Sequence, residues 1–170
     1  MRTLRAQIRA AGDEGALMRL QGHAATFNSY SQDLGGFKER ILPGAFATCL
    51  AQRADVRFLQ NHDPNFVMGR TRSNTLRLRE DSEGLAFEVI LPDTQQARDL
   101  YKTIKRGDMD QCSFAFTVDE DGDSWSEEED ERGKKFIART LKRVNLFDVS
   151  AVTYPAYQAT SVSVADGNVS

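Results

Sequence analysis

The sequence has few cysteines and no long apolar run. Cys49 and Cys112 are the two cysteines in 170 residues, too few for a disulfide scaffold and without metal-site spacing. We expect free thiols in a reducing compartment. No run of about 18 apolar residues occurs, and the charged start after Met1 lacks the apolar segment of a signal peptide. The expectation is therefore no disulfide, no metal, no cofactor and no membrane.

An excess of positive charge is also absent. Lys and Arg number 22 against 25 Asp and Glu, and the net charge is -3. Because proteins that bind nucleic acid usually carry a basic face, no nucleic-acid partner is expected. The length suits one hydrophobic core. We expect a single domain over residues 1–160 and a flexible C-terminal tail over 161–170.

Most of the chain alternates apolar and polar residues with a period of two, which predicts short strands. A helix is predicted over 95–105, with Thr94 as its N-cap and Gly107 as its stop, and a shorter one over 45–52. The fold class is therefore mainly β with peripheral helices, as a closed or partly closed antiparallel β-barrel. The expected strands are 3–10, 16–25, 56–60, 67–73, 75–79, 85–91, 112–118, 136–143 and 146–152.

Residues 119–131 hold nine carboxylates among thirteen residues. A cation site or an interaction segment is one interpretation. The spacing does not match a calcium loop, and the simpler interpretation is a solvated hairpin tip between the strands 112–118 and 136–143.

His62 is the first candidate for chemistry. Histidine exchanges protons near neutral pH, and the sequence has only His23 and His62. His62 follows an apolar strand within the turn-forming Asn61-His62-Asp63-Pro64, where a side chain is offered to solvent. A structural or merely exposed histidine is the alternative. His23 lies in an alternating strand and is expected to be packed or at the surface.

Ser113 is the second candidate. In a strand it shares one face with Ala115, while Phe114 and Phe116 occupy the other. A serine hydroxyl becomes a nucleophile only when a base removes its proton, so Ser113 requires His62. The alternative is a strand serine solvated by water.

Asp148 is the third candidate, because it interrupts an apolar terminal strand. A carboxylate in such a place needs a partner, and a histidine ring nitrogen would provide one. A surface-facing aspartate is equally compatible with the pattern. Asp63 competes for the same role, although adjacent residues of an extended segment point to opposite sides and Asp63 directly follows His62.

Taken together, the chain resembles the prohead maturation proteases of tailed phages, whose fold is similar to that of the herpesvirus capsid proteases. The resemblance extends roughly from Gly22 to Tyr157 and depends on the order of several short motifs. These are Gly22 to Ala24, Glu39 to Phe46, Asn61 to Asp63, Met68 to Thr71, Asp81 to Phe87, Ser113 to Phe116 and Asp148 to Tyr157.

The resemblance implies a serine endopeptidase with Ser113 as nucleophile, His62 as general base and Asp148 as third member. The family more often has Glu at this third position. Implied substrates are the major capsid protein precursor with its scaffold segment, and the protease itself. The implied location is the host cytoplasm inside the procapsid, or the cytoplasm for a prophage-encoded protein, and a homo-oligomer is compatible with this role.

Two alternatives differ in class. A cysteine hydrolase would use Cys112 with His62, but Cys112 has the opposite strand parity from Ser113 and would point to the Phe114 side. A capsid-assembly or scaffold-like protein would retain the fold without activity.

Overall fold

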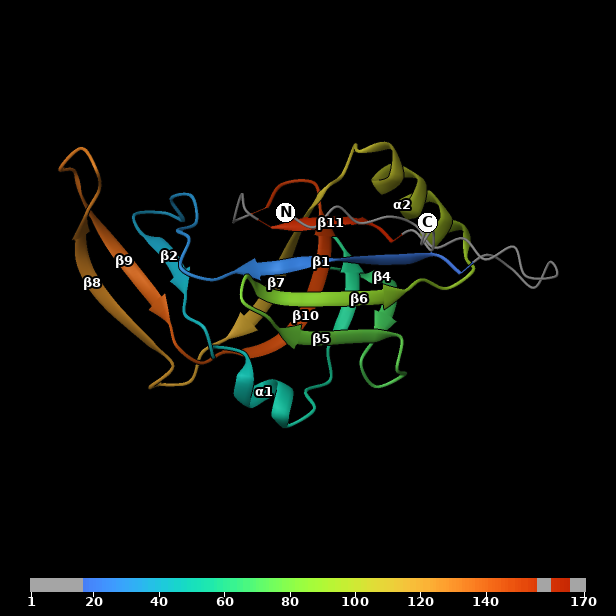
Figure 1. The fold of residues 1–170 in the computed structure, drawn as a ribbon, viewed down its shortest axis with the longest axis horizontal. Helices are drawn as coiled ribbons and strands as arrows, with labels where there is room; N and C mark the ends of the chain where they lie inside the picture. The colour runs from blue at the N-terminus through green and yellow to red at the C-terminus, as the bar shows by residue number, and fades with distance from the viewer. Residues whose placement is uncertain (1–16, 156–159, 166–170) are drawn as a thin grey trace.

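A computed structural model describes residues 17–155 and 160–165. Most of its strands lie in two sheets of four, drawn in Figure 1 with one sheet in front of the other. The front sheet has the order β11 (Ser161–Val164), β1 (Arg19–Thr26), β6 (Gly84–Ile90) and β5 (Leu76–Glu80). The second sheet is called the site sheet here, because its strands carry the candidate residues Ser113 and Asp148. Its order is β4 (Asp63–Arg70), β3 (Arg57–Gln60), β10 (Asn145–Val152) and β7 (Gln111–Thr117).

A third, three-stranded sheet stands to one side of these two, at the left of Figure 1. Its order is β2 (Lys38–Ile41), β9 (Lys135–Leu141) and β8 (Asp123–Glu129). The mainly β architecture with peripheral helices is confirmed. The pairings of the described strands give three open sheets, however, and these do not close into the expected barrel.

The hydrophobic core lies between the front sheet and the site sheet. Phe58 of β3 and Phe87 of β6 meet across it with ring centroids 5.1 Å apart. Phe46 packs edge-on against Phe114 of β7. Because strand side chains alternate between faces, the residues next to Phe58 and Phe114 point to the outer face of the site sheet. The candidate residues lie on that outer face.

Both helices occur where the sequence predicts them. In α2 (Gln95–Arg106), the Thr94 side chain accepts a hydrogen bond from the Ala97 amide, and Gly107 ends the helix with φ 89°. The shorter α1 (Ala47–Ala51) follows Phe46. Neither of these described helices is long and apolar enough to cross a membrane.

The acidic segment 119–131 differs from its predicted form, because it contains β8. This strand pairs with β9, and β7 pairs with β10, so the expected pairing of 112–118 with 136–143 is wrong. Arg139 of β9 lies over the Trp125 ring and bonds the Asp123 carboxylate at 2.8 Å. These contacts offset the repulsion that made the segment look like a solvated tip.

The two chain ends are described only in part. The predicted strand 3–10 and its turn fall outside the described residues. Within the expected tail, residues 161–164 form β11, which pairs with β1. The remaining predicted strands correspond to β1, β3 to β7, β9 and β10, with shifted ends.

His23 of β1 fastens that strand to the β5–β6 turn. It is 4% exposed, and its Nε2 lies 2.8 Å from Asp81 Oδ2 while its Nδ1 lies 3.4 Å from Glu83 Oε2. Burial by itself raises the pKa of Asp81, but hydrogen bonds from His23 and from the Glu83 and Gly84 amides outweigh it and lower that pKa. His23 is therefore a packed histidine with a structural partner.

This contact predicts a pH-dependent stability. Because the pKa of Asp81 is lower in the fold than in the unfolded chain, its carboxylate stabilises the fold at neutral pH. That contribution disappears as the pH falls below about 4. Asp81→Asn should lower the urea midpoint clearly at pH 7 and much less at pH 3, measured by circular dichroism. Asp93→Asn, at an exposed carboxylate, is the control. Equal losses from Asp81→Asn at both pH values would contradict this account.

Candidate functional site

His62 lies in a two-residue turn between β3 and β4. Gln60 and Asp63 pair across it, and Asn61 and His62 have φ of 51° and 57°. Positive φ at both central residues is the signature of the type I′ hairpin, for which glycine or asparagine is usual. Such a conformation is uncommon for a side chain as large as histidine and tends to occur at functional sites. The turn thus presents His62 in a conformation that its local preferences alone do not favour.

Strand β10 holds this turn in place. The Asn61 amide donates to the Ala151 carbonyl at 2.8 Å, and the Asn61 side chain accepts from the Thr153 amide at 2.9 Å. The His62 amide donates to Ser150 Oγ at 3.0 Å. These contacts fix the histidine backbone relative to β10.

His62 and Asp148 lie in direct contact. Nδ1 of the ring is 2.6 Å from Asp148 Oδ1, and the two side chains are 36% and 15% exposed. A ring nitrogen so close to a carboxylate donates its proton to it, which leaves Nε2 as the acceptor in the neutral ring. Within the described residues, no hydrogen bond reaches Nε2. The ring therefore has one oriented nitrogen and one that is available.

Asp63 does not reach the ring of its neighbour in a comparable way. Its Oδ1 accepts from the amide and the side chain of Asn65, at 2.9 and 3.0 Å. Of the two carboxylates that the sequence left in competition, Asp148 is thus the one that contacts His62.

Ser150 is a polar residue of the site that the sequence analysis missed. It is fully buried, with 0% exposure, although it lies on the outer face of the site sheet. Its Oγ accepts from the His62 amide, donates to Asp148 Oδ1 at 3.1 Å and lies 3.3 Å from His62 Nδ1. One hydroxyl therefore contacts both His62 and Asp148.

Ser113 faces the same side of the sheet. It is the register partner of Ser150 in the antiparallel β7–β10 pair, and Ala115 is the partner of Asp148. Side chains of directly opposed residues share a face and have Cβ atoms about 5 Å apart. Ser113 is partly exposed, and within the described residues its hydroxyl makes no hydrogen bond, to His62 or to any other group.

A bulge at Phe147 makes this arrangement possible. The register changes between Leu146 and Asp148, so that Leu146 opposes Phe116 while Asp148 opposes Ala115. Leu146 is consequently buried in the core, and Asp148 lies on the outer face.

Cys112 occupies the opposite face from Ser113. It is free, has 0% exposure and belongs to the hydrophobic core. Desolvation raises the pKa of its thiol well above the usual value. A buried, protonated thiol is neither nucleophilic nor accessible to a peptide. Among the described residues, no group of three or more His, Cys, Asp or Glu gathers as a metal site would require.

Comparison with known proteins gives one result for almost the whole chain. No curated protein matches it. The family model of the caudovirus prohead serine proteases matches residues 5–170. Since this match includes every strand of the site sheet, the chain belongs to the caudovirus prohead serine protease family.

Proposed function

We propose that the protein is a serine endopeptidase of procapsid maturation, with Ser113 as nucleophile, His62 as general base and Asp148 as the orienting carboxylate. The contact of 2.6 Å between His62 Nδ1 and Asp148, beside the outward-facing Ser113, is the observation that carries the proposal.

The chemistry follows from the proton positions. With Nδ1–H held by Asp148, Nε2 of His62 accepts the Ser113 proton as Oγ attacks the peptide carbonyl. The same nitrogen then protonates the leaving amine. Water repeats both steps on the acyl-enzyme, and the Asp148 carboxylate stabilises the imidazolium in each half.

Ser150 acts as a positioning residue in this mechanism. Because its hydroxyl donates to Asp148, it restricts the rotation of the carboxylate that orients the ring. Because it accepts from the His62 amide, it also holds the turn in its unusual backbone conformation. The first effect helps Asp148 to keep the proton on Nδ1, and the second holds the ring where Nε2 can accept a proton.

The substrates proposed are the precursor of the major capsid protein, in its scaffold segment, and the protease itself. The site of action is the procapsid in the host cytoplasm, or the cytoplasm for a prophage-encoded copy. The Ser113 hydroxyl has no hydrogen bond to Nε2 in the described structure, and catalytic hydrogen bonds often tighten only when substrate binds. Substrate binding inside the crowded shell, or assembly of the protease into a homo-oligomer, would bring the Ser113 hydroxyl into hydrogen-bond contact with Nε2 of His62.

The alternatives predict different chemistry at two neighbouring residues. The buried Cys112 thiol argues against a cysteine hydrolase, and a scaffold-like protein has no use for an oriented His62–Asp148 pair. A fluorophosphonate probe, with the labelled residue mapped by mass spectrometry, distinguishes the three. Labelling at Ser113 is expected.

The nucleophile is tested by a matched pair of neighbours. Ser113→Ala should lower peptide cleavage by a factor on the order of 10⁶, because the nucleophile is lost. Cys112→Ala should retain most activity, with a moderate loss of stability from the core cavity. Activity is measured by mass spectrometry on a mixture of synthetic peptides at high protein concentration. Full loss in Cys112→Ala with activity in Ser113→Ala would reverse the assignment.

The orienting carboxylate is tested by a second pair. Asp148→Asn should leave the protein folded but lower kcat by roughly 10–10⁴, since the amide no longer fixes the required tautomer. Asp63→Asn should cost much less, because Asp63 bonds Asn65 instead of the ring. The larger loss in Asp63→Asn would identify Asp63 as the third member.

The positioning role of Ser150 makes a separate prediction. Ser150→Ala should lower kcat about 10- to 100-fold in folded protein, with little change in KM, and Ser150→Thr should regain part of it. The Nδ1–H proton resonance of His62 should broaden or shift in Ser150→Ala, as a loss of stability alone would not cause. Ser163→Ala is the control, because the buried Ser163 hydroxyl has no partner among the described residues. An unchanged resonance and kcat would contradict the role.

A further inference from the structure

A row of four residues crosses the outer face of the site sheet beside the candidate residues. Arg57 of β3 is the register partner of Asp148 on one side and of Arg70 on the other. The four members, in strand order from β7 to β4, are Ala115, Asp148, Arg57 and Arg70. Two arginines therefore lie directly opposite each other, next to the carboxylate that holds His62.

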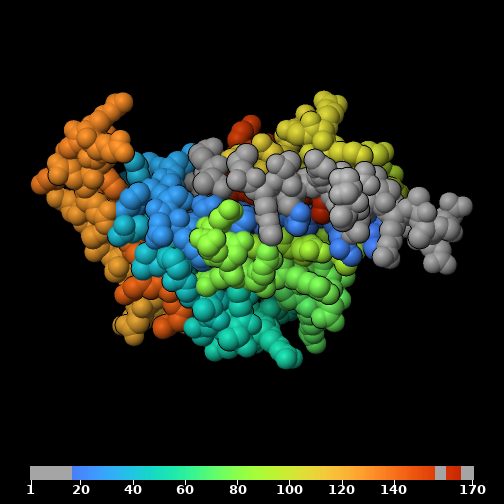
Figure 2. All heavy atoms as spheres, in the orientation of Figure 1, coloured from blue at the N-terminus to red at the C-terminus, as the bar shows by residue number. Residues whose placement is uncertain are grey.

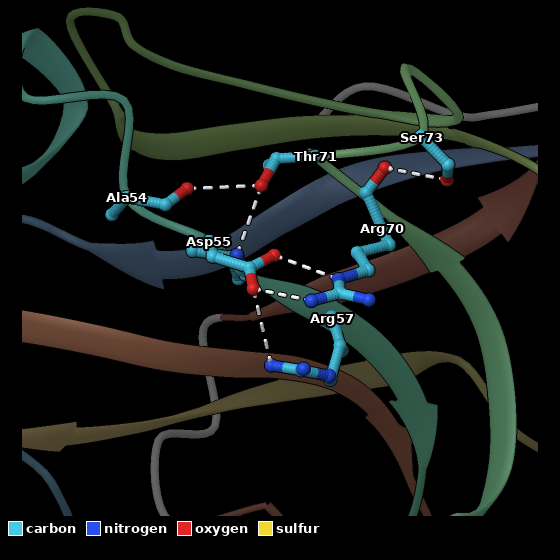
Figure 3. Close-up of polar contacts among 7 residues, drawn as sticks. Ala54, Asp55, Arg57, Arg70, Thr71 and Ser73 are labelled. Atoms are coloured by element: carbon cyan, nitrogen blue, oxygen red, sulfur yellow. Dashed lines mark hydrogen bonds and ion pairs between the residues drawn. The ribbon is translucent and has the colours of Figure 1, made fainter.

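One carboxylate serves both guanidinium groups. The Asp55 carboxylate accepts hydrogen bonds from Arg70 Nε and Nη2 at 2.8 and 2.5 Å, which is a bidentate arrangement. Arg57 Nη1 lies 3.6 Å from the same carboxylate. Figure 3 shows Asp55 between the two arginines. Asp55 is the one ion-pair partner of Arg57 in the described part of the chain, and the Arg57 side chain is 44% exposed. Most of its N–H donors are thus available to a ligand.

Like charges directly opposed on a sheet destabilise it, and the single negative charge of Asp55 offsets only one of the two positive charges that it contacts. Asp148, on the other side of Arg57, forms no ion pair with it and is engaged by His62 and Ser150. The chain as a whole is acidic, with net charge -3, so this local excess of arginine runs against the overall balance.

The positive region continues around Asp55. A hollow of about 660 Å³ adjoins it, with Leu50, Ala54 and Leu78 as apolar walls. It lies between the segments 50–55 and 71–78, at the lower edge of the space-filling view in Figure 2. Its other walls are Arg53, Asp55, Thr71, Arg72 and Asn74. A substrate chain that extends from the row of four residues past Asp55 would meet two further arginines, Arg53 and Arg72, in this hollow.

We propose that Arg57, supported by the Asp55–Arg70 pair, binds an aspartate or glutamate side chain of the peptide substrate. A guanidinium group matches a carboxylate in geometry and charge, and Arg57 has the free donors to accept one. Strand spacings put the Cα atoms of Arg57 and Ser113 roughly 12 Å apart. The acidic residue therefore lies about two to four residues from the scissile bond of an extended substrate.

This inference rests on the proposed function, because it concerns the substrate of the same site. The test uses a mixture of synthetic tetradecapeptides, with cleavage positions mapped by mass spectrometry. The best-cleaved peptide is then compared with its Asn or Gln counterpart. Wild type should prefer the acidic peptide by roughly 10- to 100-fold in kcat/KM, with most of the difference in KM.

The variants make the test specific. Arg57→Gln should abolish the preference, and Arg57→Glu should transfer it to a peptide with Lys at the same position. Arg106→Gln, which removes one exposed arginine on α2, should keep the preference. Labelling of Ser113 by the fluorophosphonate probe should proceed equally in wild type and Arg106→Gln, which shows that the control variant leaves the reactivity of Ser113 intact.

A failure of the proposed subsite and a failure of the proposed function would give different results in these measurements. Cleavage by wild type without any preference for acidic residues would overturn the subsite and leave the protease intact. An equal loss of kcat for all peptides in Arg57→Gln, with the preference retained, would also overturn it. No cleavage and no labelling of Ser113 in wild type would overturn the proposed function and the subsite together.

Discussion

The parallel pairing of β3 with β10 brings the parts of the site together. Asp148 pairs with Arg57, Ser150 with Leu59, and Ala151 with Gln60. The turn that follows β3 therefore arrives beside Ser150, where the His62 amide and ring both find partners. Because β7 pairs with the other edge of β10, Ser113 comes to the same place from the opposite side. Strand β10 is common to every contact of the site.

The core supports this pairing from the opposite face. Phe58, Phe114 and Val149 alternate with outward-facing site residues and are almost fully buried. Burial of such side chains contributes roughly 1.5–3 kcal/mol each. A shift of one residue in any of these strands would expose them, so the core fixes the register that aligns the site. Catalytic geometry and stability thus depend on the same strand alignment.

Much of the fold could be predicted from local signals. The limits of α2 follow from Thr94 and Gly107, whose side-chain and backbone chemistry acts within a few residues. Strand β8 could not be predicted in this way, because its carboxylates suggest solvent. What holds it is Trp125 packing on Phe37 and the bond from Arg139 to Asp123, contacts made by distant residues. The expected barrel is not seen in the pairings of the described strands, because the alternation of apolar and polar residues shows that a strand has two different faces but does not show where a sheet ends.

The candidate site, like the fold, could be predicted from local signals only in part. His62, Ser113 and Asp148 stand out in the sequence because a polar residue interrupts an apolar or turn-forming context. Their proximity depends on pairing across 86 residues between His62 and Asp148, which no periodicity encodes. Ser150 was missed because a small residue among Val149, Ala151 and Val152 looks like part of a buried strand, and it is indeed buried. Its function becomes visible only when its hydrogen-bond partners are known.

The bulge at Phe147 has a consequence for how this segment can vary. Strict alternation would put Leu146, Asp148 and Ser150 on one face, which would expose an apolar side chain or bury a carboxylate. The additional residue separates the two requirements, and its own side chain is 53% exposed. Many residue types would therefore be accepted at position 147, and deleting Phe147 would keep Leu146 opposite Phe116 and Asp148 opposite Ala115, because Phe147 is the unpaired residue between them. Natural variation at this point should therefore extend to the loss of the bulge itself, with the facing of Leu146 and Asp148 retained.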